Sequence, residues 1–568
     1  MSAHFRLLEA DEEAVCELVS GLSVPEPIAR VLVVRGNTSV ALAQRFLRKS
    51  MNDLQSPFEL EGIGKAAERI IQAILSKEGI VVHGDFDADG ITASALLTLF
   101  LHALGARVHP FVPNRLIENH GISLRAIEFA QRHSATLVVT CDCGSSNIQE
   151  VLELKKVGVD TIVTDHHHIL DSQRPDAILV NPKASDNEDY GELAGVGVAF
   201  MLAIAVRSNL RERGFFKERS EPNLKDYLDI VALGTVADMA PLIGQNRILV
   251  AKGLEQLEIS KRPGIEAMQE LIGFEEGKAI QSEDVGFRLA PRLNAACRLG
   301  HSEEALELLI CQDKGRALDL ARKMEQWNQE RKELMAEMLH SAQSEASHQV
   351  GEGKASIVIA SSKYHSGIIG LVAQRLAENY KVPVFVFAIE GDVARGSARS
   401  RCGIDLMAAM EGCKELMIGF GGHKEAGGCT IQASNLSEFK KIFDEMVLSQ
   451  NVFQSHEVLI DAKANFGHLD SSFLFSFNRL RPFGIGNPEP VFRAEAMVVG
   501  EPKEMGRDHI RVTLREVGGP SLTAVGFGMW RSLGSLLHGK VEVAYSPEEN
   551  EWNGRRDIRI RLRSAKPI

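Results

Sequence analysis

The chain has 568 residues, of which 44% are hydrophobic and 25% are charged. This length exceeds that of one hydrophobic core and predicts roughly two to four domains, and the composition is that of a globular protein rather than a disordered or fibrous one. The net charge of −12 at pH 7 excludes a protein that coats nucleic acid by global charge, although it allows a local basic surface.

The sequence has no recognisable membrane or secretion signal. The longest uncharged apolar stretch, Leu193 to Val206, is shorter than the ~20 residues that a transmembrane helix needs, and the N-terminus lacks the basic-then-apolar order of a signal peptide. The eight cysteines are scattered, and the CxC spacing of Cys141 and Cys143 fits neither a zinc site nor a redox motif. We expect a cytoplasmic protein with reduced thiols and no membrane contact.

The N-terminal part of the chain differs in pattern from the segment after it. Residues 1–75 mix short amphipathic segments and predict a helical extension, whose Gly62-Ile-Gly64-Lys65 turn is too short for a phosphate-binding P-loop. Within residues 76–314, from Gly79 to about Ala251, apolar runs alternate with helical patterns such as Thr92 to Leu104 and Ile148 to Val157. This alternation predicts an α/β domain with a parallel sheet.

Three predicted strands of this domain end in residues that bind metals. The segments His83–Asp89, Thr140–Cys143 and Thr164–His167 each follow a short apolar run. Because ligands of open α/β sheets bind at the carboxyl ends of the strands, these side chains should meet at one crevice. Carboxylates and imidazoles without thiolates favour Mn²⁺ or Mg²⁺ over a structural zinc. Two such ions about 3.5–4 Å apart assist phosphoryl transfer, so hydrolysis of a phosphorus ester or anhydride is the leading reaction.

A fourth segment adds a carboxylate to this set. Asp238 ends a helix-like stretch from Leu228 to Val236, which would bring it to the same crevice. A single aspartate in such a position is more simply a helix cap or a turn residue. The ordered set of three clusters together with Asp238 nevertheless favours a metal site.

The second half of the chain contains three further patterns. Arg316 to Val350 contains neither Gly nor Pro and is polar on several faces, so residues 315–350 predict a long connecting helix. Residues 351–455 predict a second α/β domain, with strands at Ala355–Ala360 and Val384–Phe387. Alternating segments such as Ile510–Arg515 then predict a small β-barrel over residues 456–568.

The order of the motifs resembles that of a known family. HxDxDxDG at His83, DCG at Asp142, DHH at Asp165 and the GTVAD motif ending at Asp238 occur in the order of the DHH phosphoesterase superfamily. Further matching segments make the chain similar to the single-strand-specific 5′ to 3′ DNA exonucleases of that superfamily, namely Pro291–Arg298, Tyr364–Gly370, Gly421–Gly428 and Arg481–Pro488. The resemblance extends from about Gly62 to near the C-terminus.

The resemblance implies a domain order and a ligand set. Residues 76–314 would form the DHH catalytic domain, residues 351–455 the DHH-associated (DHHA1) domain and residues 456–568 an OB-fold that binds nucleic acid. Two divalent ions are implied, with Mn²⁺ preferred and Mg²⁺ possible. His83, Asp87 and Asp142 would bind one ion, and Asp89, Asp142, His166 and Asp238 would bind the other. Asp142 can bind both ions because a carboxylate has two oxygens. The implied catalytic residues are Asp87, Asp89, Asp142, His166, His167 and His423. Asp85 and His167 would either support the metal ligands from behind or face the substrate.

Several polar residues are candidates for contact with the DNA backbone. The planar guanidinium groups of the arginines in Pro291–Arg298 can bind phosphate oxygens bidentately. An ion pair with Glu303 or Glu304 would explain these arginines equally well, and the resemblance favours contact with phosphate. The glycines of Gly421–Gly428 let the backbone approach an anion, and the resemblance places His423 at the scissile phosphate. The candidate substrate-binding residues are Arg292, Asn294, Arg298, His365, Ser366, Gly367, Ser397, Arg399, Gly421, Gly422, Arg559 and Arg561.

Some of these candidates have simpler explanations. His365–Gly370 could be an ordinary loop rather than a phosphate-binding turn. Arg559, Arg561 and Arg563 share one face of a predicted strand, which suits a single-strand DNA track, but a solvated edge strand would have the same pattern. Two positions depart from the family, which usually has glycine at Cys297 and tyrosine at His120.

The implied function is a single-stranded-DNA-specific 5′ to 3′ exonuclease that releases 5′-mononucleotides and acts in recombination and repair. We expect a monomer, with single-strand-binding protein and a helicase as partners. Two alternatives stay open. A DHH hydrolase of small substrates would lack the residues after Leu459, and a non-catalytic DNA-binding scaffold would have lost metal ligands.

Overall fold

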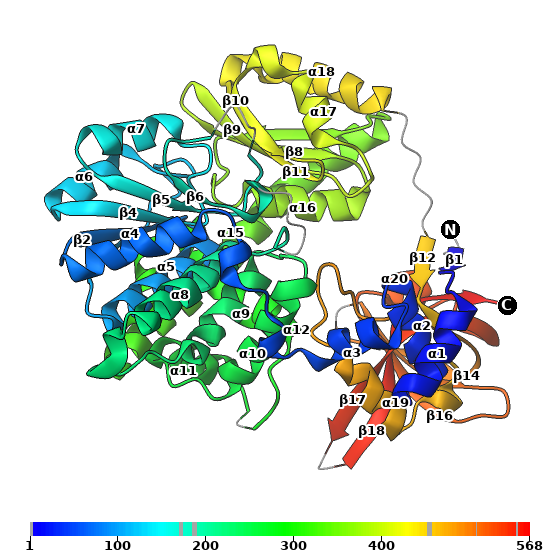
Figure 1. Cartoon of the computed structure of the whole chain (residues 1–568). Coiled ribbons are helices and arrows are strands. Elements are labelled where there is room, and N and C mark those ends of the chain that lie inside the picture. The colour runs from blue at the N-terminus through cyan, green and yellow to red at the C-terminus, as the bar shows by residue number, and fades with distance from the viewer. Residues whose placement is uncertain are drawn as a thin grey trace. The chain divides into compact units, whose positions relative to one another are not determined.

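The computed structural model describes residues 4–169, 174–184, 190–275, 277–450, 457–506, 508–552 and 555–568. The chain divides into two compact units (Figure 1). The larger unit comprises Gln55–Ala240 and Gly244–Gln454, and the smaller one comprises Met1–Leu54, Pro241–Ile243 and Ser455–Ile568.

The larger unit contains a parallel sheet with the strand order β3-β2-β4-β5-β6. Strand β2 is buried along its whole length, as its continuous apolar run predicts for a strand covered on both faces. Gly84 of β2 lies opposite Cys141 of β4, which lies opposite Thr164 of β5. The three motif segments therefore leave the sheet at the same edge. The strands are β2 (Gly79–Gly84), β3 (Arg107–Phe111), β4 (Ala135–Cys141), β5 (Asp160–Thr164) and β6 (Ile178–Val180).

Helices pack on the faces of this sheet and continue beyond it. Helix α5 (Ala88–Ala103) starts directly after β2, is buried along most of its length and packs against α8 (Gly195–Glu212) and α9 (Leu228–Ala237). The other helices of this region are α4 (Ile63–Leu75), α6 (Leu124–Arg132), α7 (Ile148–Lys156), α10 (Gly244–Glu258), α11 (Pro263–Ile272), α12 (Ser282–Asp284), the π-helical η7 (Val285–Leu289), α13 (Ala290–Arg298) and α14 (Ser302–Ile310).

The predicted connecting helix is present as α15 (Lys314–Gly351). The side chain of Asp313 caps its N-terminus by accepting a hydrogen bond from the backbone N–H of Arg316. Its N-terminal half packs on α11 and α13, and its C-terminal half packs on α16 (Ile369–Tyr380) and β7 (Ile357–Ser361). One long helix thus links the two sheets of this unit.

The second sheet of the larger unit has the strand order β10-β11-β9-β8-β7. Only the pair β7 and β8 is parallel among the described strands of this sheet, so the sheet is mixed. The rings of Phe385, Phe387, Phe439 and Phe443 pack together under it. The strands and helices are β7 (Ile357–Ser361), β8 (Val384–Glu390), β9 (Val393–Arg399), β10 (Met417–His423), β11 (Ala426–Gln432), α17 (Leu406–Glu411) and α18 (Leu436–Ser449).

The smaller unit contains the predicted barrel. Its strands follow the order β14-β15-β16-β18-β17, and pairing of β14 with β17 closes the barrel. Strand β18 lies between β16 and β17, so the alternative interpretation of this segment as an edge strand is wrong. The strands are β1 (His4–Leu7), β12 (Glu457–Ile460), β13 (Ala462–Lys463), β14 (Phe492–Met505), β15 (His509–Arg515), β16 (Ser521–Gly526), β17 (Lys540–Trp552) and β18 (Arg555–Pro567).

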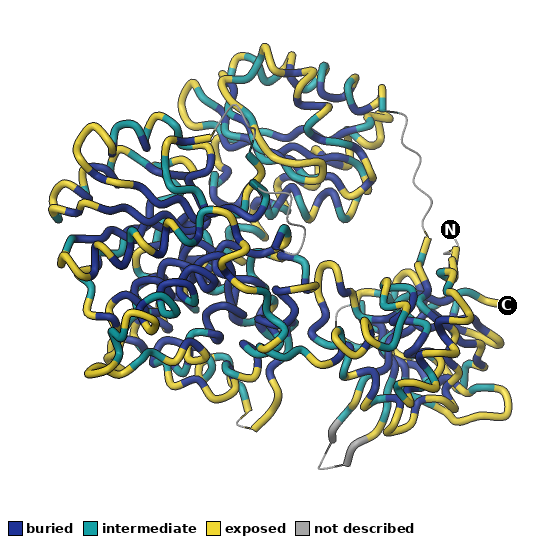
Figure 2. The backbone as a smooth tube through the Cα atoms, in the orientation of Figure 1, coloured by how far each residue is buried: buried dark blue, intermediate teal, exposed yellow. Residues whose placement is uncertain are grey.

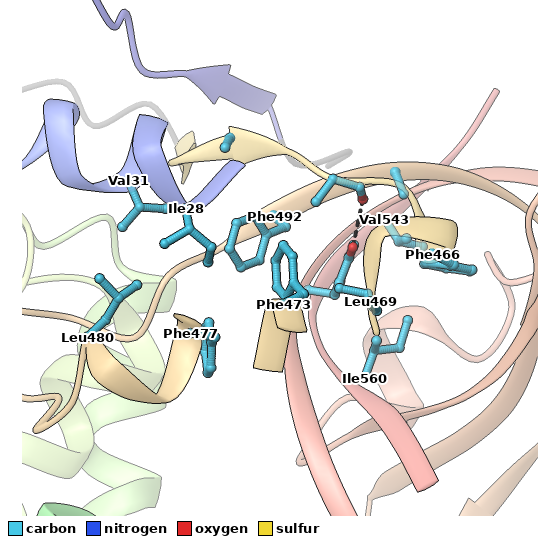
Figure 3. Packing of buried hydrophobic residues seen from close by; sticks show 14 of the residues in the cluster. Ile28, Val31, Phe466, Leu469, Phe473, Phe477, Leu480, Phe492, Val543 and Ile560 are labelled. Carbon is cyan, nitrogen blue, oxygen red and sulfur yellow. Dashed lines mark hydrogen bonds between the residues drawn. The ribbon is translucent and has the colours of Figure 1, made fainter. Parts of the chain in front are cut away.

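N-terminal helices share the core of this unit. Ile28 and Val31 of α2 lie in the same hydrophobic cluster as Phe473, Phe477 and Phe492 (Figure 3). Strand β1 also pairs in parallel with β12, which is far away in the sequence. The helices of this unit are α1 (Glu12–Leu22), α2 (Glu26–Val34), α3 (Val40–Arg48), α19 (Ser471–Arg479) and α20 (Trp530–Leu533).

The Arg481–Pro488 motif forms a loop in the smaller unit. The buried amide of Asn487 donates hydrogen bonds to the carbonyl oxygens of Leu480 (3.0 Å) and Pro482 (2.7 Å) and accepts one from the guanidinium of Arg35. The N–H of Leu242 donates to the carbonyl of Ile485 at 2.7 Å. This motif therefore closes a loop on itself and on residues remote in sequence.

The buried residues lie mainly in the sheets and in the helices packed against them. Figure 2 shows long buried stretches in the first parallel sheet and in the helices beside it, with exposed residues at loop tips. Among the described helices, none combines the length and the apolar character needed to cross a membrane.

Candidate metal centre and anion pocket

The metal-ligand residues gather where β2, β4 and β5 end. The N–H of Asp142 donates to the carbonyl of Thr164 at 2.9 Å, and the N–H of Asp85 donates to that of Cys141 at 3.1 Å. Asp142 has φ +63°, a left-handed backbone that turns the chain out of β4. The ends of the three strands are thus tied together, as the sequence predicts.

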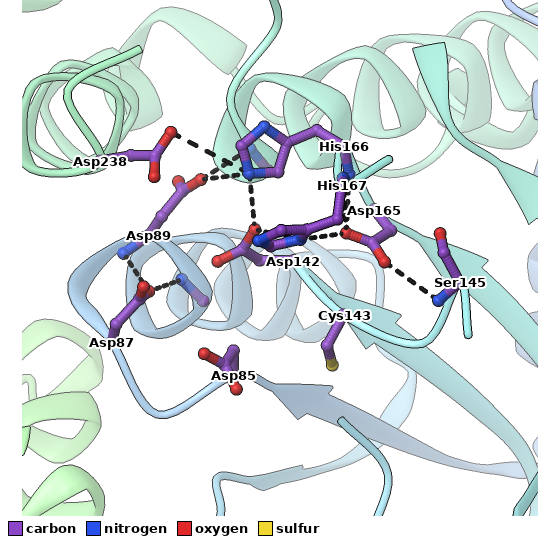
Figure 4. Close-up of polar contacts among 12 residues, drawn as sticks. Asp85, Asp87, Asp89, Asp142, Cys143, Ser145, Asp165, His166, His167 and Asp238 are labelled. Atoms are coloured by element: carbon purple, nitrogen blue, oxygen red, sulfur yellow. Dashed lines mark hydrogen bonds and ion pairs between the residues drawn. The ribbon is translucent and has the colours of Figure 1, made fainter. Parts of the chain in front are cut away.

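Two groups of candidate ligands share His166 (Figure 4). Its Nε2 atom lies 3.0 Å from Oδ1 of Asp142 and 4.0 Å from Oδ2 of both Asp89 and Asp238. Asp89, His166 and Asp238 form one group, and Asp142, His166 and His167 form the other. The expected second ion set of Asp89, Asp142, His166 and Asp238 is therefore brought together.

The third group differs from the expected first ion set. Asp85, Asp87 and Asp142 lie together, whereas the sequence expectation has His83 with Asp87 and Asp142. His83 is completely buried nearby, with Nδ1 3.6 Å from Sγ of Cys143, and its Nε2 has no hydrogen-bond partner among the described residues. A buried nitrogen without a partner is costly, so this atom is available for a ligand.

Backbone N–H groups hold the carboxylates in place. Asp87 caps α5 by accepting from the N–H groups of Asp89 (3.0 Å) and Gly90 (3.1 Å). Asp89 accepts from the N–H groups of Gly195 (2.6 Å) and Val196 (2.9 Å) at the N-terminus of α8, where helix N–H groups favour an anion.

Gly195 is a site residue that the sequence reasoning missed. A Cβ at Gly195 would lie 2.6 Å from Cβ of Asp142. Only glycine therefore allows α8 to approach both carboxylates this closely. The glycines in Leu193-Ala-Gly-Val-Gly are the only signal in the sequence, and that signal is weak.

A hydrogen bond to Asp165 orients His167. Oδ1 of Asp165 accepts from Nδ1 of His167 at 2.8 Å and from the N–H groups of His166 and His167, and its Oδ2 accepts from the N–H of Ser145. Burial alone would raise the pKa of Asp165, but these bonds lower it far below its usual range. Asp165 is thus a fixed anion that sets the position of His167.

The electrostatics of the cluster suit a divalent cation. Burial, followed by repulsion from neighbouring carboxylates, raises the pKa of Asp89 to about 7, that of Asp238 to about 9 and that of Asp142 well above its usual value. Burial lowers the pKa of His83 to about 4 and that of His166 to about 3, so both imidazoles are neutral. Mutually repelling carboxylates beside neutral imidazoles make a donor set that a divalent cation stabilises.

A cavity of about 740 Å³ lies in the same unit. It is lined by four arginines, Arg115, Arg298, Arg395 and Arg399, and by Ser366 and Ser397. Arg395 approaches Glu390 at 3.6 Å, whereas Arg115, Arg298 and Arg399 have no ion pair with a carboxylate among the described residues. Burial together with repulsion from neighbouring arginines lowers the pKa of Arg298 and Arg399. Unpaired guanidinium groups that face one cavity form an anion pocket.

Local contacts fix the arginines of this pocket. Arg298 donates to the carbonyl of Gly367 at 3.2 Å, and Arg399 donates to Oγ of Ser397 at 3.0 Å. The guanidinium of Arg115 lies 5.0 Å from the ring of Phe86, which stands between Asp85 and Asp87 in the sequence. The sequence reasoning did not single out Arg115, although this residue lies in the segment in which the family usually has tyrosine at the position of His120.

Strand register aligns the remaining candidates of the second sheet. Arg399 pairs with Ala426, which pairs with His423, and Ser397 pairs with Gly428, which pairs with Gly421. Paired residues of neighbouring strands point to the same face, so His423 shares the face of Arg399 two strands away. Gly422 adopts φ +146°, and a Cβ there would lie 2.6 Å from Cα of Gly427. His365 accepts through Nδ1 from the N–H of Gly367 at 3.1 Å.

Three other candidate arginines already have partners. Arg292 pairs with Glu325 of α15 at 2.5 Å and not with Glu303 or Glu304. Arg559 pairs with Glu548 at 2.8 Å, and Arg561 pairs with Glu489. Asn294 lies half-buried on α13 between Arg292 and Arg298.

Comparison with known proteins shows the family of the chain. The chain is 35% identical over 586 residues to the single-stranded-DNA-specific exonuclease RecJ of Salmonella typhimurium, and the match covers 99% of each chain. The chain belongs to the RecJ family. Separate segments match the DHH family N-terminal domain at residues 79–235, the DHHA1 domain at residues 353–449 and the RecJ OB domain at residues 460–564.

Solved RecJ structures have the same fold. RecJ from Thermus thermophilus in complex with Mn²⁺ has a TM-score of 0.85 and 30% identity, with coverage of 100% of this chain and 80% of that one. The Mg²⁺ complex from the same organism has a TM-score of 0.79 and 28% identity, covering 100% of this chain and 78% of that one. The resemblance indicated by the motifs is confirmed, as is the predicted order of parallel DHH sheet, long helix, DHHA1 sheet and OB barrel.

Proposed function

We propose that the protein is a metal-dependent, single-stranded-DNA-specific 5′ to 3′ exonuclease that releases 5′-mononucleotides and acts in DNA recombination and repair. The observation that carries this proposal is the carboxylate and imidazole cluster at the ends of β2, β4 and β5, in one unit with a cavity lined by three unpaired arginines. Membership of the RecJ family supports single-stranded DNA as the substrate.

The cluster would hold two divalent cations, with Mn²⁺ preferred and Mg²⁺ possible. His83, Asp87 and Asp142 would hold one ion, and Asp89, Asp142, His166 and Asp238 the other, and the grouping of Asp85 with Asp87 and Asp142 makes Asp85 a further ligand candidate. When bound, such ions activate water as a nucleophile and stabilise the negative charge of a leaving oxygen.

The protein's own residues would position the DNA and its reacting phosphate. Asp165 would keep His167 in one orientation beside the ligands, through the 2.8 Å bond to its Nδ1. His423 would donate to a non-bridging oxygen of the scissile phosphate, as the shared face with Arg399 supports. Such a donor stabilises the charge that builds up on the phosphate oxygens.

The anion pocket would set the polarity of degradation. A terminal phosphate carries more charge than an internal phosphodiester, so it would be favoured by Arg115, Arg298 and Arg399. A strand whose 5′-phosphate is bound there would present its first internal phosphodiester for cleavage. Ser366, Gly367 and Ser397 would add donors along the same cavity.

The remaining assignments extend the proposal to the whole chain. Residues 1–75, 76–314, 315–350, 351–455 and 456–568 would be the extension, the DHH domain, the connecting helix, the DHHA1 domain and the OB domain. Arg559 and Arg561 would hold single-stranded DNA after exchanging their carboxylate partners for phosphates. We propose a monomer that works with single-strand-binding protein and a helicase.

The test compares four substrates with purified protein in Mn²⁺. These are a single-stranded oligonucleotide, the same sequence as a blunt duplex, a dinucleotide and pyrophosphate. The proposal predicts mononucleotide release from the single strand, with the duplex spared and the small substrates cut slowly. Fast cleavage of only the dinucleotide or pyrophosphate would favour a small-substrate phosphoesterase, and strand binding without cleavage would favour a scaffold.

A further inference from the structure

His120 belongs both to the surroundings of the metal centre and to the wall of the anion pocket. Its Nδ1 lies 3.1 Å from Oδ1 of Asp85, and its ring lies 5.0 Å from that of His167 in an edge-on arrangement. The same residue lines the cavity that contains Arg115, Arg298 and Arg399. Among the described residues, only Phe86 combines a place in the cavity wall with a place in the HxDxDxDG motif, and its ring lies 6.4 Å from that of His120.

Contacts before and after His120 in the sequence hold its loop in place. Glu118 accepts from the N–H of Asn114 at 2.7 Å and from the hydroxyl of Ser123 at 2.6 Å. Gly121, with φ +98°, follows directly, and a Cβ there would overlap Oδ1 of Asn147. The backbone of His120 is therefore fixed by neighbours that are not part of the metal cluster.

The exposure of the His120 ring distinguishes between two roles, support of Asp85 and contact with the substrate. A histidine that served only to satisfy the buried carboxylate of Asp85 would be expected to be buried with it. The His120 side chain is instead 47% exposed, whereas that of Asp85 is 4% exposed. With Nδ1 turned toward Asp85, Nε2 is the ring nitrogen that remains for a group in the cavity.

We propose that His120 is a substrate-contacting residue that binds the phosphodiester lying between the terminal-phosphate pocket and the metal centre. This inference rests on the proposed function, because it assumes that a nucleic-acid strand occupies the cavity. Asp85, His167 and Gly121 hold the imidazole in place, and Nε2 meets an oxygen of the strand. In this protein His120 would thus make the substrate contact in place of the tyrosine that the family usually has at this position.

The test separates substrate contact from support of Asp85. His120→Ala, His120→Gln and His120→Tyr are compared with His348→Ala, a matched control on the C-terminal turn of α15 whose side chain is 72% exposed. Three quantities are measured: Mn²⁺ affinity from the electron paramagnetic resonance signal of free Mn²⁺, affinity for a 5′-phosphorylated oligonucleotide in EDTA, and the single-turnover rate of first-nucleotide release.

The inference predicts a specific pattern. His120→Ala should lower the single-turnover rate and the strand affinity in EDTA, together by about tenfold to a hundredfold, while Mn²⁺ affinity stays within about twofold. Glutamine and tyrosine should each recover part of the loss, because both can hydrogen-bond to a phosphate oxygen.

Other outcomes overturn it. If Mn²⁺ affinity falls by the same factor as the rate, His120 only supports Asp85. If His120→Ala matches the wild type in rate and strand affinity, or if glutamine and tyrosine are no better than alanine, His120 does not contact the substrate. A wild type that fails to cut single strands would refute the proposed function itself, which the His120 variants leave untouched.

Discussion

The Nε2 atom of His166 lies 3.0 Å from Oδ1 of Asp142, and neither atom has a hydrogen bond to any described residue. The two residues come from the ends of neighbouring strands β5 and β4, so the fold itself forces the contact. Two buried polar atoms this close, both unsatisfied, are expected where a ligand completes the arrangement. The contact between Asp142 and His166 is the geometric basis of the proposed metal centre.

Asp142 should therefore be essential for metal binding. Asp142→Asn should lower nuclease activity by at least about a hundredfold, because charge stabilisation at the reacting phosphate is lost, and it should reduce the number of Mn²⁺ ions bound. Rate and metal stoichiometry are measured side by side. Asp176→Asn, at a carboxylate paired with Lys155 on the surface, should behave as the wild type. Full activity of Asp142→Asn would refute the ligand assignment.

Metal-free protein should lose stability as the pH rises from 7 to 9. The pKa of Asp238 is raised to about 9 by burial and by repulsion from Asp89 and Asp87. In this range the folded protein retains a proton that the unfolded chain has released, so the free energy of unfolding falls with pH. His120, whose pKa Asp85 raises to about 9 against the effect of burial, contributes with the same sign.

Bound Mn²⁺ should offset the loss of stability at high pH, because it neutralises the carboxylates of the cluster. Mn²⁺ should therefore raise Tm more at pH 8.5 than at pH 6.5. Thermal unfolding in EDTA and in Mn²⁺ at the two pH values measures the difference. Asp238→Asn in EDTA should show a weaker loss of Tm over the same range. Equal shifts by Mn²⁺ at both pH values would contradict this account of the cluster.

The arginines of the anion pocket should determine the preference for a 5′-phosphate. Arg399→Ala should reduce the ratio of initial rates on 5′-phosphorylated and 5′-hydroxyl strands by about tenfold to a hundredfold, the usual effect of one charged hydrogen bond. Arg395 lines the same cavity and approaches Glu390 at 3.6 Å, so Arg395→Ala is a suitable control with a smaller effect. An unchanged ratio in Arg399→Ala would place the terminal phosphate elsewhere.

Glu489 should limit how strongly the barrel binds DNA. Its carboxylate, 9% exposed, pairs with both Arg561 and Arg563. Glu489→Gln should lower Tm, because two arginines lose their carboxylate partner. It should nevertheless raise the affinity for single-stranded DNA in EDTA, and the slope of log Kd against log[salt] should become steeper by about one. Unchanged affinity and salt dependence would show that this face of β18 does not contact DNA.

Asn487 should stabilise the smaller unit. Asn487→Ala leaves the carbonyls of Leu480 and Pro482 and the guanidinium of Arg35 with fewer partners. Each buried group left unsatisfied costs about 1–3 kcal/mol, so the free energy of unfolding should fall by at least about 2 kcal/mol. Chemical denaturation measures the loss, with Asn52→Ala as an exposed control in the same unit. A loss below that of the control would contradict the role of the loop.

The convergence of the strand ends was predictable from the sequence. Parallel strands place their carboxyl ends at one edge, so the positions of Asp87, Asp142 and His166 follow from the order of apolar runs and motifs. The barrel and the long helix were likewise predictable, because period-2 alternation and the absence of Gly and Pro are local signals.

Contacts between residues far apart in the sequence were not predictable. The grouping of Asp85 rather than His83 with Asp87 and Asp142 depends on side-chain directions within one turn. Arg292 of α13 pairs with Glu325 of α15, and Arg115 lines the anion pocket from the loop that follows β3. The packing of Ile28 and Val31 with Phe473 and Phe492 joins the two ends of the chain, which no local pattern reveals.

The most direct test of the central claim is the order in which label is released from a single-stranded oligonucleotide. The oligonucleotide carries a label at either the 5′ or the 3′ end and is mixed with the protein in Mn²⁺ or EDTA. The account predicts immediate release of a labelled mononucleotide from the 5′ end, a delay for the 3′ label, and no release in EDTA or by Asp142→Asn. Immediate release of the 3′ label, or release that persists in EDTA, would contradict it.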